Sequence, residues 1–139
     1  MPFVKVYIHF VWSTKNRAPF LNTPELRNQV WQHIRENGKE KNLFIDTVNG
    51  FCDHCHCLLS LGTDQTLQKV IQLIKGESSF WINRYFKSEF SKQKFKWQNE
   101  YYAVAVGESM LEQVRQYIKN QEEHHKTKSF QQEYPEFLK

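Results

Sequence analysis

The sequence contains one dense run of metal-binding and nucleophilic residue types, Asp53-His54-Cys55-His56-Cys57. In a β-strand, alternation would place His54 and His56 on one face and Cys55 and Cys57 on the other. Two imidazoles on one face can chelate a cation and leave positions open for a substrate, whereas a structural zinc site needs four converging ligands. We therefore interpret the histidines as a candidate metal dyad and the cysteines as small core residues. That both histidines are structural is the alternative that spacing leaves open.

A candidate nucleophile, Tyr117, lies on a segment expected to be helical. Gln113, Tyr117 and Gln121 follow one another at intervals of four residues and so share a helix face. An adjacent stripe, Leu111, Val114 and Ile118, would pack on the core. A phenol is protonated at neutral pH and needs a nearby cation or base to attack, and its covalent product divides one difficult displacement into two easier ones. Ordinary amphipathic packing is the alternative for this tyrosine.

The first half of the chain must supply the strand that carries the dyad. Apolar residues alternate from Val4 to Trp12, which predicts a strand with one buried face. Thr23 and Pro24 predict the cap and first residue of a helix that ends at Asn37-Gly38. We expect a second strand over residues 43–48, a hairpin turn at Asn49-Gly50, and a third strand over about 51–61.

The second half should supply two helices and one strand. A long helix is expected to open at Gly62-Thr63-Asp64, followed by a strand over 101–106. Ser109 to Glu112 resembles a capping box, which predicts a helix to about His125, and a short helix is expected around residues 130–134. The order predicts an α+β fold, a ferredoxin-like βαββαβ antiparallel sheet with helices on one face, plus a C-terminal helix carrying the tyrosine. The other sheet face should be open to a ligand or partner.

Length and composition limit the class of protein. With 139 residues, 40% of them hydrophobic, we expect a single domain over residues 1–139, with about 126–139 as a C-terminal tail. The sequence shows neither a membrane-spanning apolar stretch nor a signal peptide. Its three cysteines lie too close together for a disulfide framework. These features predict a reduced, cytoplasmic protein that is not in a membrane.

Positive charge is concentrated although the net charge is only +4. Residues 84–97 hold five basic residues against one acid, interleaved with aromatic side chains, a mixture that suits a polyanion with stacking bases. A solvated basic loop is the alternative for this segment, as it is for Lys15 and Arg17 after the first strand. The candidate DNA-binding residues are Lys15, Arg17, Lys75, Arg84 and Lys94.

Several motifs together resemble one family. His54-Cys55-His56 is similar to the His-hydrophobe-His signature of HUH nucleases, with cysteine in the hydrophobic position. Residues 117–121, Tyr-Ile-Lys-Asn-Gln, resemble the tyrosine helix of the single-tyrosine, insertion-sequence-200-like transposases. Further similarity runs through residues 9–15, Lys75-Gly76 and residues 123–125. The resemblance covers most of the chain in the same order.

The resemblance implies an activity and a site. In such a transposase, His54, His56 and Gln121 would bind a divalent metal, Mg²⁺ or Mn²⁺, and Tyr117 would form a 5′-phosphotyrosine on single-stranded DNA. A free 3′ hydroxyl would remain to rejoin strands. The resemblance also implies recognition of DNA hairpins and a homodimer whose active sites can combine residues of both subunits. The ligand types alone would equally suit zinc or nickel.

Other interpretations of the same residues stay open. A replication-type HUH nickase shares the dyad and the tyrosine but is usually larger. A non-enzymatic ferredoxin-like nucleic-acid-binding module would need no metal or nucleophile, and a small structural zinc protein is disfavoured by the strand alternation. Tyr85, Tyr101 and Tyr102 are alternative phenols; neither Tyr101 nor Tyr102 has a glutamine one helical turn later.

Overall fold

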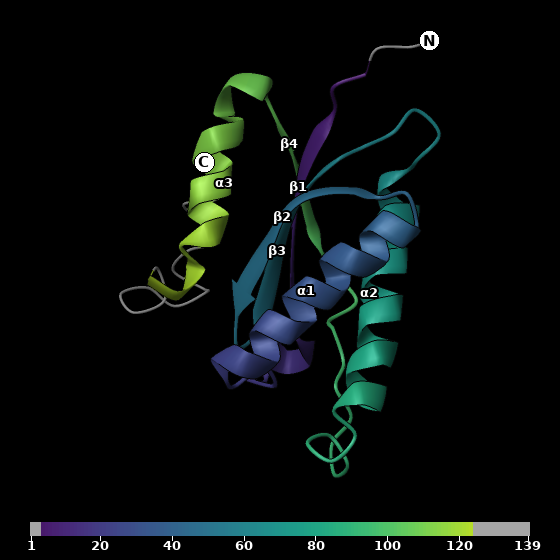
Figure 1. Ribbon diagram of the computed structural model, residues 1–139, viewed down its shortest axis with the longest axis vertical. Helices are drawn as coiled ribbons and strands as arrows, with labels where there is room; N and C mark the ends of the chain where they lie inside the picture. The colour runs from purple at the N-terminus through teal and green to yellow at the C-terminus, as the bar shows by residue number, and fades with distance from the viewer. Residues whose placement is uncertain (1–3, 124–139) are drawn as a thin grey trace.

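The computed structural model describes residues 4–123, which form one four-stranded antiparallel sheet and three α-helices (Figure 1). Along the chain the elements are β1 (Tyr7–Ser13), η1 (Lys15–Arg17), α1 (Pro24–Glu40), β2 (Phe44–Phe51), β3 (His54–Ser60), α2 (Leu67–Tyr85), β4 (Tyr102–Val106), η2 (Glu108–Met110) and α3 (Leu111–Lys119). The strand order is β2-β3-β1-β4. This is the expected ferredoxin-like βαββαβ arrangement followed by a further helix.

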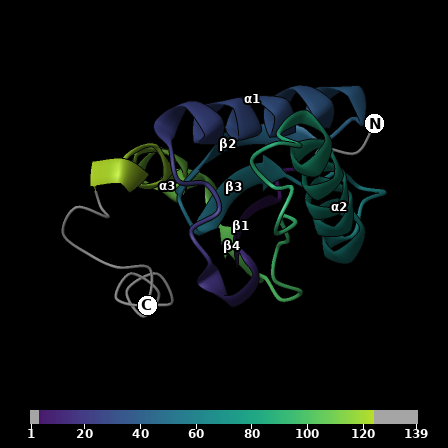
Figure 2. The same ribbon diagram turned by 90° about the horizontal axis from the view of Figure 1, so that it is seen from below.

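The main core lies between the sheet and α1 and α2. Alternation sends Phe10, Cys55 and Cys57 into it, where each is fully buried. Figure 2 shows α1 and α2 together on one side of the molecule, with α3 apart from them. Among the described residues, no helix combines the length and apolar character needed to cross a bilayer.

The sequence analysis predicted that the second face of the sheet would be open, but α3 covers part of it. Leu58 of β3 packs against Leu111 and Ile118 of α3 in a separate small cluster. Because the apolar stripe of α3 needs a surface to cover it, the helix folds back over the β2–β3 half of this face. The fold thereby places Tyr117 and Gln121 beside the strand that carries the histidines.

Two strand boundaries differ from the predictions. Val4 and Val6 lie outside β1 and are exposed, because the ladders with β3 and β4 both begin at Tyr7. Asn49-Gly50 is not a turn. Both residues belong to β2 and pair with β3, and the chain reverses at Cys52 and Asp53. No glycine of the described chain has positive φ, so the two-residue turn typical of Asn-Gly is not formed.

The first two helices also differ at their ends. Helix α1 continues through Gly38 to Glu40, because Gly38 lies against Ile45, where a Cβ would come within 2.5 Å of the isoleucine Cδ1. Helix α2 begins only at Leu67, where the Thr66 hydroxyl accepts a hydrogen bond from the Lys69 amide. The earlier Gly62-Thr63-Asp64 signal therefore belongs to the preceding turn.

Helix α3 lacks the predicted capping box. A 3₁₀ turn, Glu108–Met110, precedes it, and the helix begins without a side-chain cap. The helix ends at Lys119, Asn120 forms a turn, and residues 121–123 are again helical. His125, the predicted end, lies outside the described residues. The short helix expected at 130–134 and the C-terminal tail lie outside the described residues.

Candidate active site

The two histidines of the dyad project from β3 toward α3. Both side chains are buried, and their ring centroids lie 5.0 Å apart. Cys55 and Cys57 point into the main core, as alternation predicted. Burial raises the pKa of the Cys57 thiol to about 12 and that of Cys55 well above its ordinary value. The cysteines are therefore core residues, and the imidazoles alone face the site.

Each imidazole is oriented by a hydrogen bond to its Nδ1. Asp53 Oδ1 lies 2.8 Å from His54 Nδ1, and His9 Nε2 lies 3.0 Å from His56 Nδ1. A carboxylate can only accept, so His54 must carry its proton on Nδ1 toward Asp53. Carboxylate–histidine pairs of this kind fix the tautomer and the ring orientation of metal ligands. Nε2 is therefore the nitrogen that each ring offers to the site.

Gln121 completes a three-residue cluster with the dyad. Its side chain is fully buried, and its Oε1 lies 3.0 Å from His54 Nε2. The carboxamide nitrogen donates to the Tyr117 carbonyl at 3.1 Å. A flipped amide would direct its oxygen at that carbonyl, so the backbone of α3 fixes the oxygen toward His54. The structure places these three residues next to one another, and their role as metal ligands stays a prediction.

The donor set fits a divalent cation. The Nε2 of His54 and the Oε1 of Gln121 face each other at 3.0 Å, so a cation between them could take both atoms as ligands. Neighbouring ligands of an octahedral ion with bonds of about 2.1 Å lie about 3 Å apart, which is the separation observed. No three His, Cys, Asp or Glu side chains within residues 4–123 are grouped to hold a metal. A third donor in this cluster would be the Gln121 carboxamide, and that set differs from the four Cys and His ligands of a structural zinc site.

Tyr117 lies beside this cluster within the same chain. Its half-buried ring meets His56 edge-on, with centroids 5.7 Å apart, and His9 with centroids 6.4 Å apart. The sheet and α3 therefore bring together the predicted nucleophile, the dyad and Gln121, which are far apart in the sequence.

The alternative phenols are placed differently. Tyr85 is exposed at the end of α2 and stacks on Trp81, with ring centroids 4.8 Å apart. Tyr101 packs against Phe10 of the main core. Tyr102 on β4 pairs with Val11 on β1, and Val11 pairs with His56 on β3. Tyr102 is therefore on the same sheet face as the dyad, with β1 between their strands. Tyr117 has a ring contact with a dyad histidine, whereas Tyr85 and Tyr101 contact rings in other parts of the molecule.

A basic pocket lies near the dyad end of β1. Lys15, Lys94 and Lys96 line a cavity of about 410 Å³ together with Asn16, Ala18, Phe20 and Gln93. The Lys15 amide donates to the Lys96 carbonyl, and the preceding Thr14 amide donates to the carbonyl of Asp53. Backbone pairing thereby connects this positively charged pocket to the residue that orients His54.

The remaining predicted DNA-binding residues are separate from this pocket. Lys75 is half-buried on α2, and its ammonium donates to the carbonyls of residues 98, 99 and 100. Burial lowers the pKa of Lys75. Arg84, in the last turn of α2, and Arg17, in η1, are exposed. Lys75 thus supports the segment before β4, in addition to any role in binding.

The sequence was compared with known families and structures. The model of the family described as "Transposase IS200 like" matches residues 2–121. This chain belongs to the IS200-like transposase family. Membership implies that the transposase cleaves and transfers DNA, which sets aside the non-enzymatic and zinc-structural interpretations.

Individual relatives agree with this assignment. The transposase is 26% identical over 119 residues to the ISDra2 transposase TnpA of Deinococcus radiodurans, with 81% of each chain covered. A crystal structure of a candidate transposase from D. radiodurans R1 matches with a TM-score of 0.69 at 23% identity, over 86% of this chain and 93% of the other. A REP-associated tyrosine transposase bound to a REP hairpin matches with a TM-score of 0.64 at 18% identity, over 90% and 72%. These two structures establish the fold.

Sequence reasoning missed several residues that arrange the site. Asn49, assigned to a turn, lies on β2 and donates to the carbonyls of Ile118 and Lys119 at 3.0 and 3.1 Å. His9, only loosely placed by its alternation, is a hydrogen-bond partner of His56. Alternation within β2 could have placed Asn49 opposite His56, had the register of the hairpin been known.

Proposed function

We propose that this transposase cleaves and rejoins single-stranded DNA through a 5′-phosphotyrosine on Tyr117. The observation that carries the proposal is the placement of Tyr117 beside His56, with the Oε1 of Gln121, four residues later, directed at His54. Holding a nucleophile and electrostatic groups in one orientation removes much of the entropic barrier of a displacement. Tyr85, exposed at the end of α2, and Tyr101, packed against Phe10 of the main core, are not placed in this way.

The chemical step is a displacement at phosphorus. The phenolic oxygen of Tyr117 loses its proton and forms a bond to the phosphorus, while the bond from phosphorus to the 3′ oxygen breaks. The 3′ oxygen takes a proton and leaves as a hydroxyl. The reverse attack by a 3′ hydroxyl on the phosphotyrosine rejoins a strand and releases the phenol, so no nucleotide cofactor is needed.

His54, His56 and Gln121 would hold the divalent metal, which we propose to be Mg²⁺ or Mn²⁺. When bound, the cation supplies charge stabilisation at a phosphoryl oxygen. The chain itself supplies the orientation: Asp53 and His9 hold the two imidazoles, and the Tyr117 carbonyl holds the carboxamide.

The DNA strand would leave the dyad along the basic pocket. Lys15, Lys94 and Lys96 line it without a carboxylate among the lining residues, so a backbone phosphate is its expected ligand. Replacing Lys94 with Gln should weaken single-stranded DNA binding and reduce the slope of log affinity against log salt by about 0.7. The matched control is Lys41→Gln, at an exposed lysine that ends α1. An unchanged slope for Lys94→Gln, measured by fluorescence anisotropy, would place the phosphates elsewhere.

The substrate class is proposed from the resemblance together with one relative. The REP-associated transposase is bound to a hairpin, and we propose that a hairpin in single-stranded DNA is also recognised here. A labelled hairpin oligonucleotide with Mg²⁺ or Mn²⁺ should give a denaturation-resistant protein–DNA adduct. Tyr117→Phe should form no adduct, whereas the control Tyr85→Phe should form it at the wild-type rate. An adduct in Tyr117→Phe would move the nucleophile elsewhere, and hairpin binding without an adduct under several metals would contradict the proposed chemistry.

A homodimer with shared active sites is a further proposal from the resemblance. Tyr117 already lies beside the dyad of its own chain, which favours sites formed within one subunit. Mixing His56→Ala with Tyr117→Phe under conditions that exchange subunits tests the alternative. Recovered cleavage in heterodimers would demonstrate a composite site, and equal inactivity would support sites within one chain.

A further inference from the structure

Helix α3 has a small apolar interface for an element that carries the proposed nucleophile and ends two residues before the proposed metal ligand Gln121. Within residues 4–123, the cluster beneath it has three buried residues, Leu58, Leu111 and Ile118, with the partly buried side chains of Tyr7, Val106, Val114 and Tyr117 packed against them. The histidines instead belong to a strand that borders the main core. A helix held by so few apolar contacts opens more readily than the core unless other contacts hold it. Polar contacts between α3 and β2 are therefore expected to matter for the position of Tyr117.

A β-bulge in β2 provides the first such contact. Ile45 pairs with Leu59 on the core side, and Thr47 pairs with Leu58 on the α3 side, so Asp46 is the extra residue between them. Bulges re-aim side chains that regular alternation would direct elsewhere. Here the bulge lets Ile45 reach the core while the carboxylate of the next residue reaches α3.

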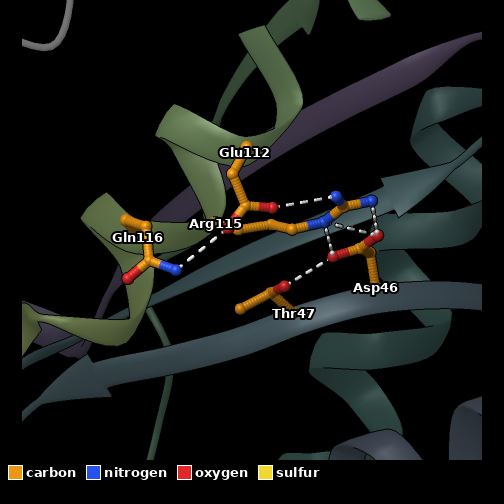
Figure 3. Close-up of polar contacts among 5 residues, drawn as sticks. All are labelled: Asp46, Thr47, Glu112, Arg115 and Gln116. Carbon is orange, nitrogen blue, oxygen red and sulfur yellow. Dashed lines mark hydrogen bonds and ion pairs between the residues drawn. The ribbon is translucent and has the colours of Figure 1, made fainter.

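Arg115 of α3 meets this carboxylate with two nitrogens. Its Nε lies 2.9 and 3.1 Å from the two oxygens of Asp46, and its Nη2 lies 2.8 Å from Oδ2 (Figure 3). The Thr47 hydroxyl donates to the same carboxylate at 2.6 Å. The hydrogen bonds from Arg115 lower the pKa of Asp46 and keep it ionised. Bidentate arginine–carboxylate pairs fix relative orientation as well as distance.

Asn49 provides a second contact two residues beyond Thr47. Its carboxamide nitrogen donates to the carbonyls of Ile118 and Lys119, in the last turn of α3. The carbonyls at the end of a helix are the ones left to partners outside it, and these two lie between Tyr117 and Gln121 in the sequence. The two contacts thus join β2 to α3 on both sides of the tyrosine.

We propose that Asp46, Arg115 and Asn49 form a latch that positions Tyr117 against the histidine dyad. The inference rests on the proposed function of Tyr117. These three are positioning residues, since they act on the reaction through the placement of α3. Loss of the latch lowers the population of helices with the phenol next to the dyad and leaves hairpin binding unchanged.

The test compares Asp46→Asn and Asn49→Ala with Glu112→Gln. Glu112 contacts Arg115 and Gln116 from within the same helix and does not reach the sheet, so its replacement removes an ion pair from Arg115 without affecting the latch. Single-turnover adduct formation should slow by about three- to tenfold in each latch variant, as expected for a few partly exposed hydrogen bonds, with unchanged hairpin affinity. Exchanging the partners, Asp46→Arg with Arg115→Asp, should recover part of the rate.

Hydrogen exchange provides a measurement that does not depend on activity. Amides of α3 should exchange about three- to tenfold faster in Asp46→Asn than in the wild type, while those of α1 and the Glu112→Gln control stay unchanged. Unchanged α3 protection in both latch variants would overturn the latch, whether or not the protein forms adducts. If α3 protection falls but the wild type forms no adduct, the latch as a structural device stands and the proposed role of Tyr117 fails.

Discussion

Replacing Gln121 with leucine tests the metal site directly. Leucine preserves the volume of the side chain approximately but removes the oxygen that lies 3.0 Å from His54 Nε2. If this oxygen is a ligand, cation affinity should fall on the order of a hundredfold, comparable to the largest effects seen when the partners of metal ligands are altered. The change should therefore appear as lost stabilisation by metal.

The expected shift follows from mass action. At a Mn²⁺ concentration one hundred times the wild-type Kd, binding stabilises the folded state by about 2.7 kcal/mol, and a hundredfold weaker site gives about 0.4 kcal/mol. For a chain of 139 residues, an unfolding entropy of about 2.1 cal/mol/K per residue converts these values to Tm increases of about 9 and 1 °C. Thermal melts with and without Mn²⁺, followed by circular dichroism, measure both.

The comparison uses metal-induced differences, so that other effects of the substitution cancel. Gln121→Leu also removes the hydrogen bond to the Tyr117 carbonyl, which lowers Tm in both conditions. Gln116→Leu is the matched control, because the side chain of this exposed glutamine on α3 bonds only to Glu112 among the described hydrogen bonds. A full metal-induced shift in Gln121→Leu would show that the carboxamide is not a ligand.

Two further predictions concern the fold. Gly50→Ala should destabilise the protein by about 2–3 kcal/mol through overpacking, because the added Cβ would lie 2.1 Å from the His54 carbonyl oxygen. The Cβ added by Gly76→Ala on α2 meets nothing within 4 Å, so this variant should stabilise the protein by about 0.5–1 kcal/mol. Urea unfolding measures both free energies, and equal effects would contradict the packing described. In Ellman's assay at pH 8, only Cys52 should react quickly in the folded protein. A pKa of about 12 leaves Cys57 with about one thiolate in ten thousand, and Cys55 is equally buried; rapid reaction of all three thiols would refute this.

The fold was predictable because its signals are local. Alternation in the dyad segment correctly separated the histidines from the cysteines, and helical spacing correctly predicted that Leu111 and Ile118 would pack. These patterns report which side of an element is buried, and burial decides most of the architecture.

Features that depend on distant neighbours were not predictable in the same way. Asn49-Gly50 is a strong local turn signal, yet the register of β2 with β3 places it inside the strand, where Gly50 fits beneath Trp31 and the His54 carbonyl. The bulge at Asp46 left a weak trace, since the buried positions Leu43 and Val48 are an odd number of residues apart. The pairing of Gln121 with His54 needs the position of α3, which no single segment encodes.

The site combines parts of unequal stability. The dyad belongs to a strand that is hydrogen-bonded on both sides. Tyr117 lies on α3, which has a small apolar interface and polar contacts to β2, and Gln121 follows the end of this helix. A cation held by His54, His56 and Gln121 would bridge these two parts, so that its binding free energy would also stabilise the docked helix. By thermodynamic linkage, docking must then raise cation affinity by the same factor. On this view the metal and the latch act on one equilibrium, and weakening the latch should weaken metal binding even though none of its residues is a ligand.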